Sequence, residues 1–400
     1  MRAKLSSPPV AAVAMALSAL LAGAGCDGRG ELEAVAAFGD RQCTGVAVSR
    51  DGRVFVSFPN WSPGHDVSVA EVMPDGTIRP YPDRQTNTWG PGDDPRDRFV
   101  CVQSVYIDTQ DPTSSLWVLD SGNPRFEGGG QARSTGTEDS GVVPNAAKLV
   151  SIDLGSNQIA RAVRFDAALA PAGSYLNDVR TDMERGFAYI TDSGLGALVV
   201  VNLNTGRCRR VLEGHVSTRA EAGVEPVIGG RAWRQPDGTV PQVHADGIAL
   251  SDDGETLYFK ALVGRTLYRV STSALRNFSM PDSILQQQVR PIGKAPVCDG
   301  MICDGQGNVY MTALEQDAIV VRRPDGRIDT VVRGDLLKWP DSLAISPAGD
   351  LLVTCSQIHL APWFNGGHDN RQGPYTLYKL PGVAPALPAI DKPPAKPPAP

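Results

Sequence analysis

A short pattern recurs six times along the chain and restricts the folds that the chain can adopt. Each copy begins with a polar residue, continues with an apolar stretch, passes through a turn of acidic, Ser or Gly residues, and ends in a β-rich run. This order predicts a β-hairpin, two strands joined by a tight turn with side chains that alternate with period two. The copies are residues 44–56, 103–119, 177–191, 246–259, 299–311 and 341–353.

The spacing between the copies predicts a closed ring of sheets. Repeats of roughly 40 to 70 residues are typical of radial arrays, because a single repeat cannot bury both of its faces. Six repeats predict an all-β fold, a six-bladed β-propeller. The first strand of each blade lies innermost in such a ring, so we expect the first residues of the six copies to converge on one mouth of the central tunnel. These lead residues are Thr44, Gln103, Asn177, Asp246, Asp299 and Asp341.

The propeller is expected to span residues 31–380. Residues 32–38 and 375–380 are both candidate strands, and pairing between them would close the ring without leaving a free sheet edge. Residues 381–400 are rich in Pro and Ala, which predicts an extended, disordered tail.

The N-terminus has the pattern of an export signal. Residues 1–25 contain two basic residues, an apolar stretch too short to span a bilayer, and small residues before Cys26. Residues 24–26 resemble a bacterial lipobox, although Gly23 stands where Leu is usual. We therefore expect a periplasmic or cell-surface lipoprotein attached to the membrane only through Cys26, or a secreted protein if Cys26 is not lipidated.

The net charge limits the expected binding partners, and the number of cysteines limits the possible disulfides. A net charge of −6 with scattered basic residues gives no reason to expect nucleic acid binding. Six cysteines follow Cys26, so an exported chain could form up to three disulfides, or several of these cysteines could be buried free thiols. Cys298 and Cys303 lie on one predicted strand, roughly 16 Å apart if extended, and should not bond to each other.

Two insertions interrupt the repeats and are candidates for functional loops. Residues 123–145 lack a strand pattern, and residues 213–244 end directly before Asp246, so the second insertion should lie over the tunnel mouth. It contains His215 and His244, which are weak candidates for acid–base catalysis near neutral pH. The chain contains no nucleophile elbow, P-loop or dinucleotide fingerprint.

Several motifs in order resemble the yellow / major royal jelly protein family. They are residues 58–61, 104–108 with 116–122, 246–251 with 257–259, and 339–343, and the resemblance covers about residues 38 to 365. It implies a six-bladed propeller that is usually exported. Insect members of the family include dopachrome-converting proteins of pigment pathways and proteins that bind or store ligands.

A more distant resemblance is to the senescence-marker / gluconolactonase-like propellers. That family implies a divalent cation in the tunnel, held by Glu, Asn and Asp, and lactone hydrolysis. Asn177 and Asp299 match polar tunnel positions of the family, whereas Thr44 stands where its first-blade Glu is expected and Asp246 where it has Asn. The missing Glu argues against a metal-dependent lactonase, although Asp246 and Asp341 could replace its charge.

The lead residues have the chemistry of a hard-cation site. Ca²⁺ takes six to eight oxygen ligands from carboxylates, amide carbonyls and water. We therefore expect Asn177, Asp246, Asp299 and Asp341 to be candidate ligands of Ca²⁺ or another divalent cation. Without a cation, closely spaced carboxylates repel, and at least one pKa should rise. The alternative is that these side chains only bond the backbone of the next blade. Asp108, Asp182 and Asp304 follow the inner strands and are expected to form turns.

Three functional hypotheses follow from these patterns. The first is an exported propeller that binds a small organic molecule at the tunnel mouth, through the six lead residues and with or without a divalent cation. The second is an enzyme, either a metal-dependent lactone or ester hydrolase or a tautomerase-like protein. The third is a non-catalytic surface protein whose loops bind another protein. The fold alone cannot choose between them.

Overall fold

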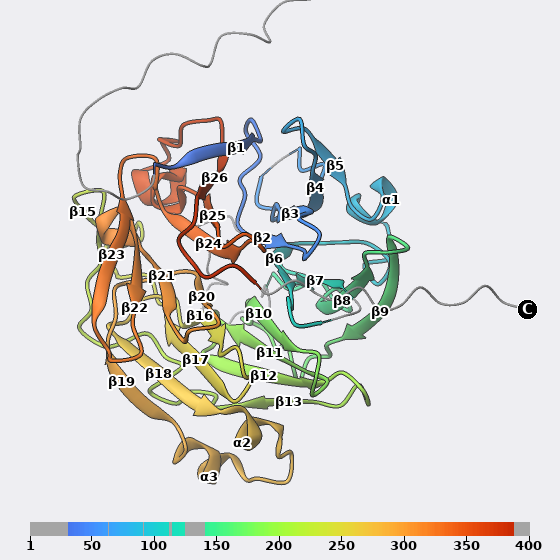
Figure 1. Cartoon of the computed structure of the whole chain (residues 1–400), viewed down its shortest axis with the longest axis vertical. Coiled ribbons are helices and arrows are strands. Elements are labelled where there is room, and N and C mark those ends of the chain that lie inside the picture. The colour runs from blue at the N-terminus through green and yellow to red at the C-terminus, as the bar shows by residue number, and fades with distance from the viewer. Residues whose placement is uncertain (1–30, 63, 91, 112–113, 125–140, 388–400) are drawn as a thin grey trace, which may run out of the picture.

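The computed structural model describes residues 31–387, apart from residues 63, 91, 112–113 and 125–140. Six four-stranded antiparallel sheets surround a central axis, and in Figure 1 the colour passes once around the ring from blue to red. The predicted all-β six-bladed propeller is therefore confirmed. Within the described ranges, no helix is both long enough and apolar enough to cross a membrane.

Blades 1 to 5 each consist of four strands that follow one another in the chain. Blade 1 contains β2 (Val46–Val48), β3 (Val54–Ser57), β4 (Val69–Val72) and β5 (Ile78–Pro80). Blade 2 contains β6 (Val102–Ile107), β7 (Ser115–Asp120), β8 (Lys148–Asp153) and β9 (Gln158–Arg164). Blade 3 contains β10 (Leu176–Asp182), β11 (Phe187–Asp192), β12 (Ala197–Asn202) and β13 (Cys208–Val211). Blade 4 contains β16 (Ala245–Leu250), β17 (Thr256–Ala261), β18 (Thr266–Ser271) and β19 (Arg290–Lys294). Blade 5 contains β20 (Met301–Cys303), β21 (Val309–Ala313), β22 (Ala318–Arg322) and β23 (Ile328–Arg333).

Blade 6 joins the two ends of the propeller. It contains β24 (Pro340–Ile345), β25 (Leu351–Cys355) and β26 (Thr376–Leu380), and its outer strand is β1 (Glu33–Ala37) from the N-terminal side. The pairing of β1 with β26 is antiparallel, and blue β1 lies beside red β26 in Figure 1. The predicted closure of the ring by strands from both ends is confirmed.

The remaining elements are short and lie outside the blades. The insertion before blade 4 contains a two-stranded hairpin, β14 (Val227–Ile228) and β15 (Arg231–Ala232). The helices are α1 (Arg84–Asn87), α2 (Thr272–Arg276), α3 (Asp282–Gln286), η1 (Leu314–Gln316), η2 (Ile358–Leu360) and η3 (Pro362–Asn365).

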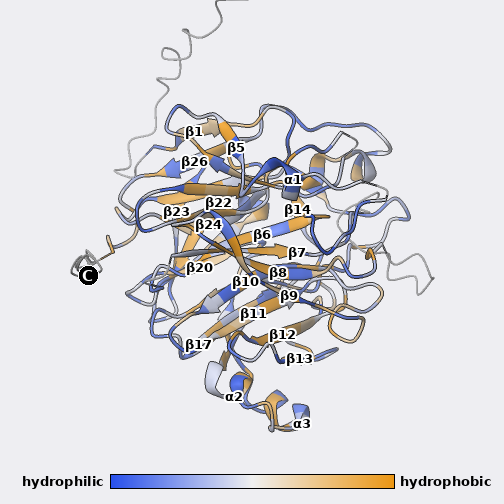
Figure 2. Cartoon of the chain, turned by 90° about the vertical axis from the view of Figure 1, so that its right-hand side faces the viewer, coloured by the Kyte–Doolittle hydropathy of each residue, from blue (hydrophilic) through white to orange (hydrophobic). Residues whose placement is uncertain are grey.

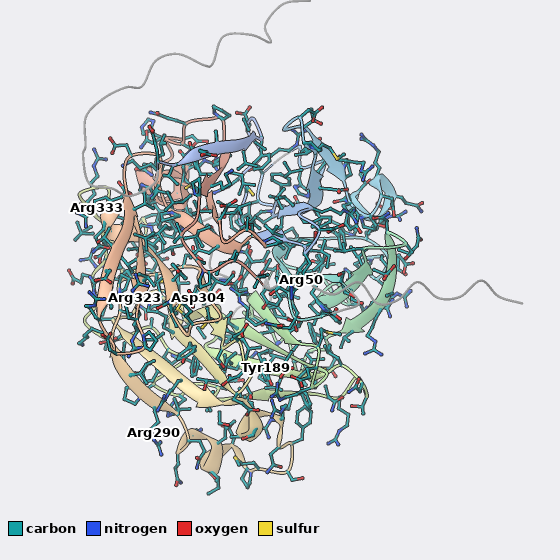
Figure 3. The ribbon with its side chains drawn as sticks, in the orientation of Figure 1. Arg50, Tyr189, Arg290, Asp304, Arg323 and Arg333 are labelled. Carbon is teal, nitrogen blue, oxygen red and sulfur yellow. The ribbon has the colours of Figure 1, made fainter. Side chains whose placement is uncertain are left out.

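The core lies between neighbouring blades. Alternating side chains of each strand face opposite sides of the sheet, so each blade packs apolar residues against both neighbours. Val46 and Val56 of blade 1, for example, pack in one cluster with Ala344 and Leu352 of blade 6. Figure 2 shows the apolar strands inside and the polar loops at the surface. In Figure 3 the side chains fill the space between the blades, and Arg290 lies at the rim.

A β-bulge lies at the lead position of blades 2, 3, 4 and 6. In blade 3, Asn177 and Asp178 together lie opposite the single residue Thr191. The Thr191 hydroxyl accepts a hydrogen bond from the Asp178 N–H and donates to the carbonyl of Asp246 in blade 4, at 2.8 Å. In the same way, the Ser57 hydroxyl donates to the carbonyl of Gln103 in blade 2. The Thr354 hydroxyl donates to the carbonyl of Thr44 in blade 1. Bulges redirect side chains, and these hydroxyls fix the lead residues of adjacent blades relative to one another.

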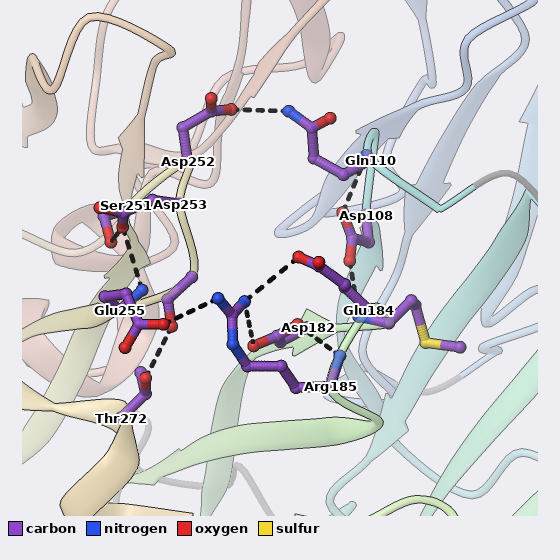
Figure 4. A network of polar contacts seen from close by, with 12 residues as sticks. Asp108, Gln110, Asp182, Glu184, Arg185, Ser251, Asp252, Asp253, Glu255 and Thr272 are labelled. Atoms are coloured by element: carbon purple, nitrogen blue, oxygen red, sulfur yellow. Dashed lines mark hydrogen bonds and ion pairs between the residues drawn. The ribbon is translucent and has the colours of Figure 1, made fainter.

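The opposite end of the tunnel is formed by the hairpin turns. The carboxylates of Asp108, Asp182 and Asp304 accept hydrogen bonds from backbone N–H groups two or three residues further on, which confirms their prediction as turn formers. Figure 4 shows that this network also crosses between blades, because Gln110 of blade 2 donates to Asp252 of blade 4 at 2.8 Å.

The first part of the segment predicted to be a disordered tail contacts the propeller. Backbone hydrogen bonds join Ala384 to Gly349 and Leu387 to Pro347, and Leu387 lines a cavity of about 70 Å³ beside the inner strands. Residues 388–400 lie outside the described residues, as do the predicted export signal (1–25) and the predicted lipidation site, Cys26.

The cysteines of the described residues are all free. They are Cys43, Cys101, Cys208, Cys298, Cys303 and Cys355. The expected disulfides are therefore absent from residues 31–387 as described, and the alternative of free thiols holds. Cys43, Cys101, Cys298 and Cys355 are buried and act as small apolar side chains in the packing.

Candidate functional site

The six lead residues are buried where the inner strands begin. Each is at most 7% exposed, and three of them, Asp246, Asp299 and Asp341, interact electrostatically with one another. The structure thus brings together the three carboxylates that the repeat pattern predicted. Thr44 donates its hydroxyl hydrogen to the carbonyl of Gln103 at 2.8 Å, so it contributes to the seam between blades 1 and 2.

Asp246 and Asp299 form a hydrogen-bonded carboxyl pair. Burial, together with the charge of Asp299, raises the pKa of Asp246 well above its usual range. Burial also raises the pKa of Asp299 to about 7, opposed by hydrogen bonds to Trp339 and Asp246. Both pKa values are thus raised, as expected for closely spaced buried carboxyl groups, which favours a proton on the pair.

Trp339 holds one oxygen of this pair in place. Its indole Nε1 donates to Asp299 Oδ2 at 2.7 Å, and its backbone has a φ of 55°. A positive φ is rare for a bulky residue and marks a conformation that the surrounding structure has to impose. Trp339 precedes the lead residue of blade 6 by two positions, and the sequence analysis did not include it among the site residues.

Two carboxylate oxygens of the cluster have no partner in the described structure. They are Asp246 Oδ1 and Asp341 Oδ2, both buried. Burial raises the pKa of Asp341 well above its usual range, and the charge of Asp299 contributes. Unpartnered buried oxygens are costly and call for an explanation such as a missing ion or water.

Two buried cations lie among these carboxylates. Lys260 is completely buried, and its Nζ donates to the carbonyls of Ala261 at 2.6 Å and Leu262 at 3.4 Å. Arg180 lies 3.6 Å from the carboxylate of Asp178 and donates to the carbonyl of Met301 in blade 5. Neither cation was predicted. Lys260 occupies the position at which four other blades have Ser57, Thr191, Thr312 and Thr354, so an alignment of the second strands would have identified it.

The formal charges of this cluster do not balance. Asp178, Asp246, Asp299 and Asp341 are four buried carboxyl groups, and Arg180 and Lys260 are two buried cations. Two negative charges are left over if every carboxyl group is ionised. Two protons, or one divalent cation, would neutralise the site.

Aromatic side chains cover this end of the tunnel. Trp233, from the 213–244 insertion, packs against Trp339 with ring centroids 5.0 Å apart, so the insertion lies over the mouth as predicted. Trp61 donates from Nε1 to the hydroxyl of Tyr175 at 3.0 Å, and that hydroxyl donates to Gln103 Oε1 at 2.8 Å. The polar lead residues are thereby shielded from solvent.

The two candidate histidines lie outside this cluster of contacts. His215 bonds to Ser217, and burial lowers its pKa, with Asp282 opposing the change. The Nδ1 atom of His244 accepts a hydrogen bond from the backbone of Ala220, and burial lowers the pKa of His244 to about 4. Burial thus favours the neutral form of both rings, and no contact between either ring and the tunnel carboxylates is seen in the described residues.

The cluster is not a preformed metal centre. Among the described residues, no group of three or more His, Cys, Asp or Glu side chains is arranged to hold a metal ion. The donors nevertheless have suitable chemistry, because the unpartnered oxygens of Asp246 and Asp341 and the amide of Asn177 are hard oxygen ligands. A cation bound by these oxygens would compete with protons, because burial raises the pKa values of Asp246 and Asp341.

Comparisons with known proteins agree with this architecture. Residues 100–361 match the family model described as "Major royal jelly protein". Among solved structures, a luciferin-regenerating enzyme is similar at 12% identity, over 88% of this chain and 96% of that chain, with a TM-score of 0.51. A calcium-binding protein, regucalcin, from Agrobacterium tumefaciens is 16% identical over 88% and 94% of the two chains, with a TM-score of 0.47. A gluconolactonase from Xanthomonas campestris is 14% identical over 88% and 90%, also with a TM-score of 0.47. No curated protein matches the sequence. Similarity at these identities concerns the fold alone.

Proposed function

Since the chain belongs to the major royal jelly protein family, we propose that it is an exported propeller that binds a small organic molecule at the tunnel mouth, together with a divalent cation. The ligand site comprises the lead residues Gln103, Asn177, Asp246, Asp299 and Asp341 beneath the aromatic cover. Such a buried site, with a few convergent polar groups and perturbed pKa values, is the usual form of a small-molecule site.

The observation that carries this proposal is the unbalanced charge. Four buried carboxyl groups against two buried cations leave room for two positive charges, and Asp246 Oδ1 and Asp341 Oδ2 have no partner within the described structure. Asn177, Asp246, Asp299 and Asp341 would hold the cation. When bound, a divalent cation polarises a carbonyl group and lowers the pKa of a water molecule.

Cation binding is tested by metal analysis and calorimetry. We expect a divalent cation in protein purified without chelator, and a higher melting temperature when Ca²⁺ is added to chelator-treated protein. Binding should release protons, because burial raises the pKa values of Asp246 and Asp341 and a bound cation favours the ionised carboxylates. Asp341→Asn should weaken binding at least about tenfold, since it removes a charged ligand.

Asp97→Asn is the matched control, because Asp97 is exposed and its substitution should leave cation binding unchanged. If no cation copurifies and added Ca²⁺ leaves the melting temperature unchanged, the cation part of the proposal is wrong. Native mass spectrometry of the same sample tests the organic ligand separately, as an added mass that denaturation releases.

The Asp246–Asp299 pair favours a second candidate function, hydrolysis of a lactone or ester or a tautomerase-like proton transfer. A carboxyl group with a pKa of about 7, hydrogen-bonded to a second carboxyl group, can take up and return a proton near neutral pH. Asp299 would act as the base and Asp246 as its proton-holding partner.

This second candidate predicts activity that depends on Asp299. Wild-type protein should hydrolyse at least one member of a lactone and ester panel, or convert a tautomeric substrate. Asp299→Asn should lower kcat by about 10²- to 10⁴-fold, the usual contribution of a general acid or base. Asp97→Asn should retain the rate. If wild-type protein converts no substrate of the panel faster than buffer does, the enzyme hypothesis is wrong and only the proposed binding function is left.

A further inference from the structure

A second cavity lies outside the tunnel, between the hairpin β14–β15 and residues 359–372 of blade 6. Its volume is about 750 Å³, within the range of small-molecule sites. The turn residues Gly229 and Gly230 both have positive φ, as a two-residue hairpin turn of type I′ requires. Gly229 lies over His359, since a Cβ there would be 3.6 Å from the imidazole ring.

The walls of this cavity are anchored to the propeller. The backbone N–H of Val227 donates to Glu315 Oε1 of blade 5 at 3.0 Å, and Glu315 also pairs with Arg265. On the other side, Asn365 donates to the carbonyls of His359 and Ala361. One wall is therefore tied to blade 5, and the other is fixed by hydrogen bonds within its own turn.

The electrostatic character of this cavity is opposite to that of the tunnel. The residues described as lining it include Arg231, Arg234 and two histidines, and none of them is Asp or Glu. Arg234 pairs with Glu225 at 2.7 Å. Arg231 makes no ion pair within the described part of the chain, so its guanidinium is available for an anion. An arginine can bind a carboxylate through two parallel hydrogen bonds.

The other lining groups suit a hydroxylated ring. Trp233 and Phe364 form an aromatic wall, with ring centroids 5.1 Å apart. The negative face of an aromatic ring attracts the positively polarised C–H groups of a sugar ring. Asn370 and Gln372 add side-chain amides, which donate and accept hydrogen bonds with neighbouring hydroxyl groups.

We propose that this cavity is a binding site for a sugar acid, an acidic monosaccharide or disaccharide whose carboxylate pairs with Arg231 and whose ring lies against Trp233 and Phe364. The site is separate from the proposed tunnel site. The tunnel lead residues offer carboxyl groups, whereas the outer cavity offers Arg231 and no Asp or Glu among its described lining residues, and it is the guanidinium that attracts a carboxylate. The two sites share a wall, because Trp233 packs on Trp339, which donates to Asp299.

Calorimetry with D-glucuronate tests the proposal. D-glucose is the control probe that lacks the carboxylate, and acetate is the control probe that lacks the hydroxyl groups. Wild-type protein should bind glucuronate at micromolar to millimolar concentration, and each control probe at least about tenfold more weakly. Arg231→Ala should weaken glucuronate binding by about 10- to 100-fold, because it removes a charged hydrogen-bond donor. Arg161→Ala, at an exposed position on β9, should bind as the wild type does.

Tryptophan fluorescence provides a second readout. Glucuronate should change the emission of the wild type, and Trp233→Phe should remove that change. Asp341→Asn, in the tunnel, should leave glucuronate binding unchanged, which separates this site from the proposed function. No binding by the wild type would overturn the proposal. Equal affinity of Arg231→Ala and wild type, or loss of binding in Asp341→Asn alone, would also contradict it.

Discussion

Replacing Lys260 with Met is expected to lower the free energy of unfolding by about 3 to 5 kcal/mol, the usual effect of removing one partner from a buried charged network. Lys260 is completely buried and donates to the carbonyls of Ala261 and Leu262. Methionine has a similar length but no donor, so both carbonyls would lose this bond. Asp246 would also lose its electrostatic interaction with the Lys260 ammonium group.

Urea denaturation of the two proteins at pH 7 measures this loss. The matched control is Lys294→Met on β19, where the side chain is exposed and the change should be within about 0.5 kcal/mol. A Lys260→Met protein as stable as the control would show that the ammonium group is not needed for the packing of blades 4 and 5. The proposed charge balance of the tunnel would then have to be revised.

The stability of the metal-free protein is expected to fall as the pH rises from about 4 to above 7. The folded-state pKa of Asp299 is raised from 3.8 to about 7, so the folded protein binds a proton that the unfolded chain has already released. The stabilisation by this proton is complete below pH 4 and is lost as the pH passes the folded pKa. The change is on the order of 4 kcal/mol for Asp299, and the raised pKa values of Asp246 and Asp341 act in the same direction.

Asp299→Asn should remove most of the Asp299 contribution. Its amide oxygen can still accept from Trp339 and its amide nitrogen can donate to Asp246, so the geometry is kept while the titration is lost. Unfolding in urea at pH 5 and pH 8, with chelator present, measures the effect. The wild type should lose more stability between these pH values than Asp299→Asn does. The Asp97→Asn control should behave like the wild type, and a wild type equally stable at both pH values would contradict the interpretation.

The ring of six blades could be predicted because the hairpin pattern occurs six times in the sequence. Each hairpin is a local pattern, and six copies of it determine the number of blades without knowledge of any tertiary contact. The closing strand β1 was also predictable, because an apolar segment before the first repeat needs a partner strand. The burial of Asp246, Asp299 and Asp341 at one end follows from their shared position in the repeat.

The partners of these carboxylates could not be predicted so directly. Trp339 donates to Asp299 from a backbone with a positive φ, and that conformation is a property of the folded blade. Lys260 faces the tunnel carboxylates because a bulge places it opposite Asp246 and Gly247, and a shift of one residue would turn it to the other face. His215 was proposed from its loop position, yet the folded loop pairs it with Ser217.

The closure of blade 6 determines when the ring of blades can be completed. During synthesis β1 emerges early but has no partner until Thr376–Leu380 has been made. The Thr354 hydroxyl of β25 also donates to the carbonyl of Thr44, across the boundary between blades 6 and 1. A ribosome-bound chain that ends before β26 thus exposes the unpaired edge of β1 and lacks the finished tunnel mouth. The ring, and with it the arrangement of the six lead residues around one axis, consequently cannot be completed until β26 has been made.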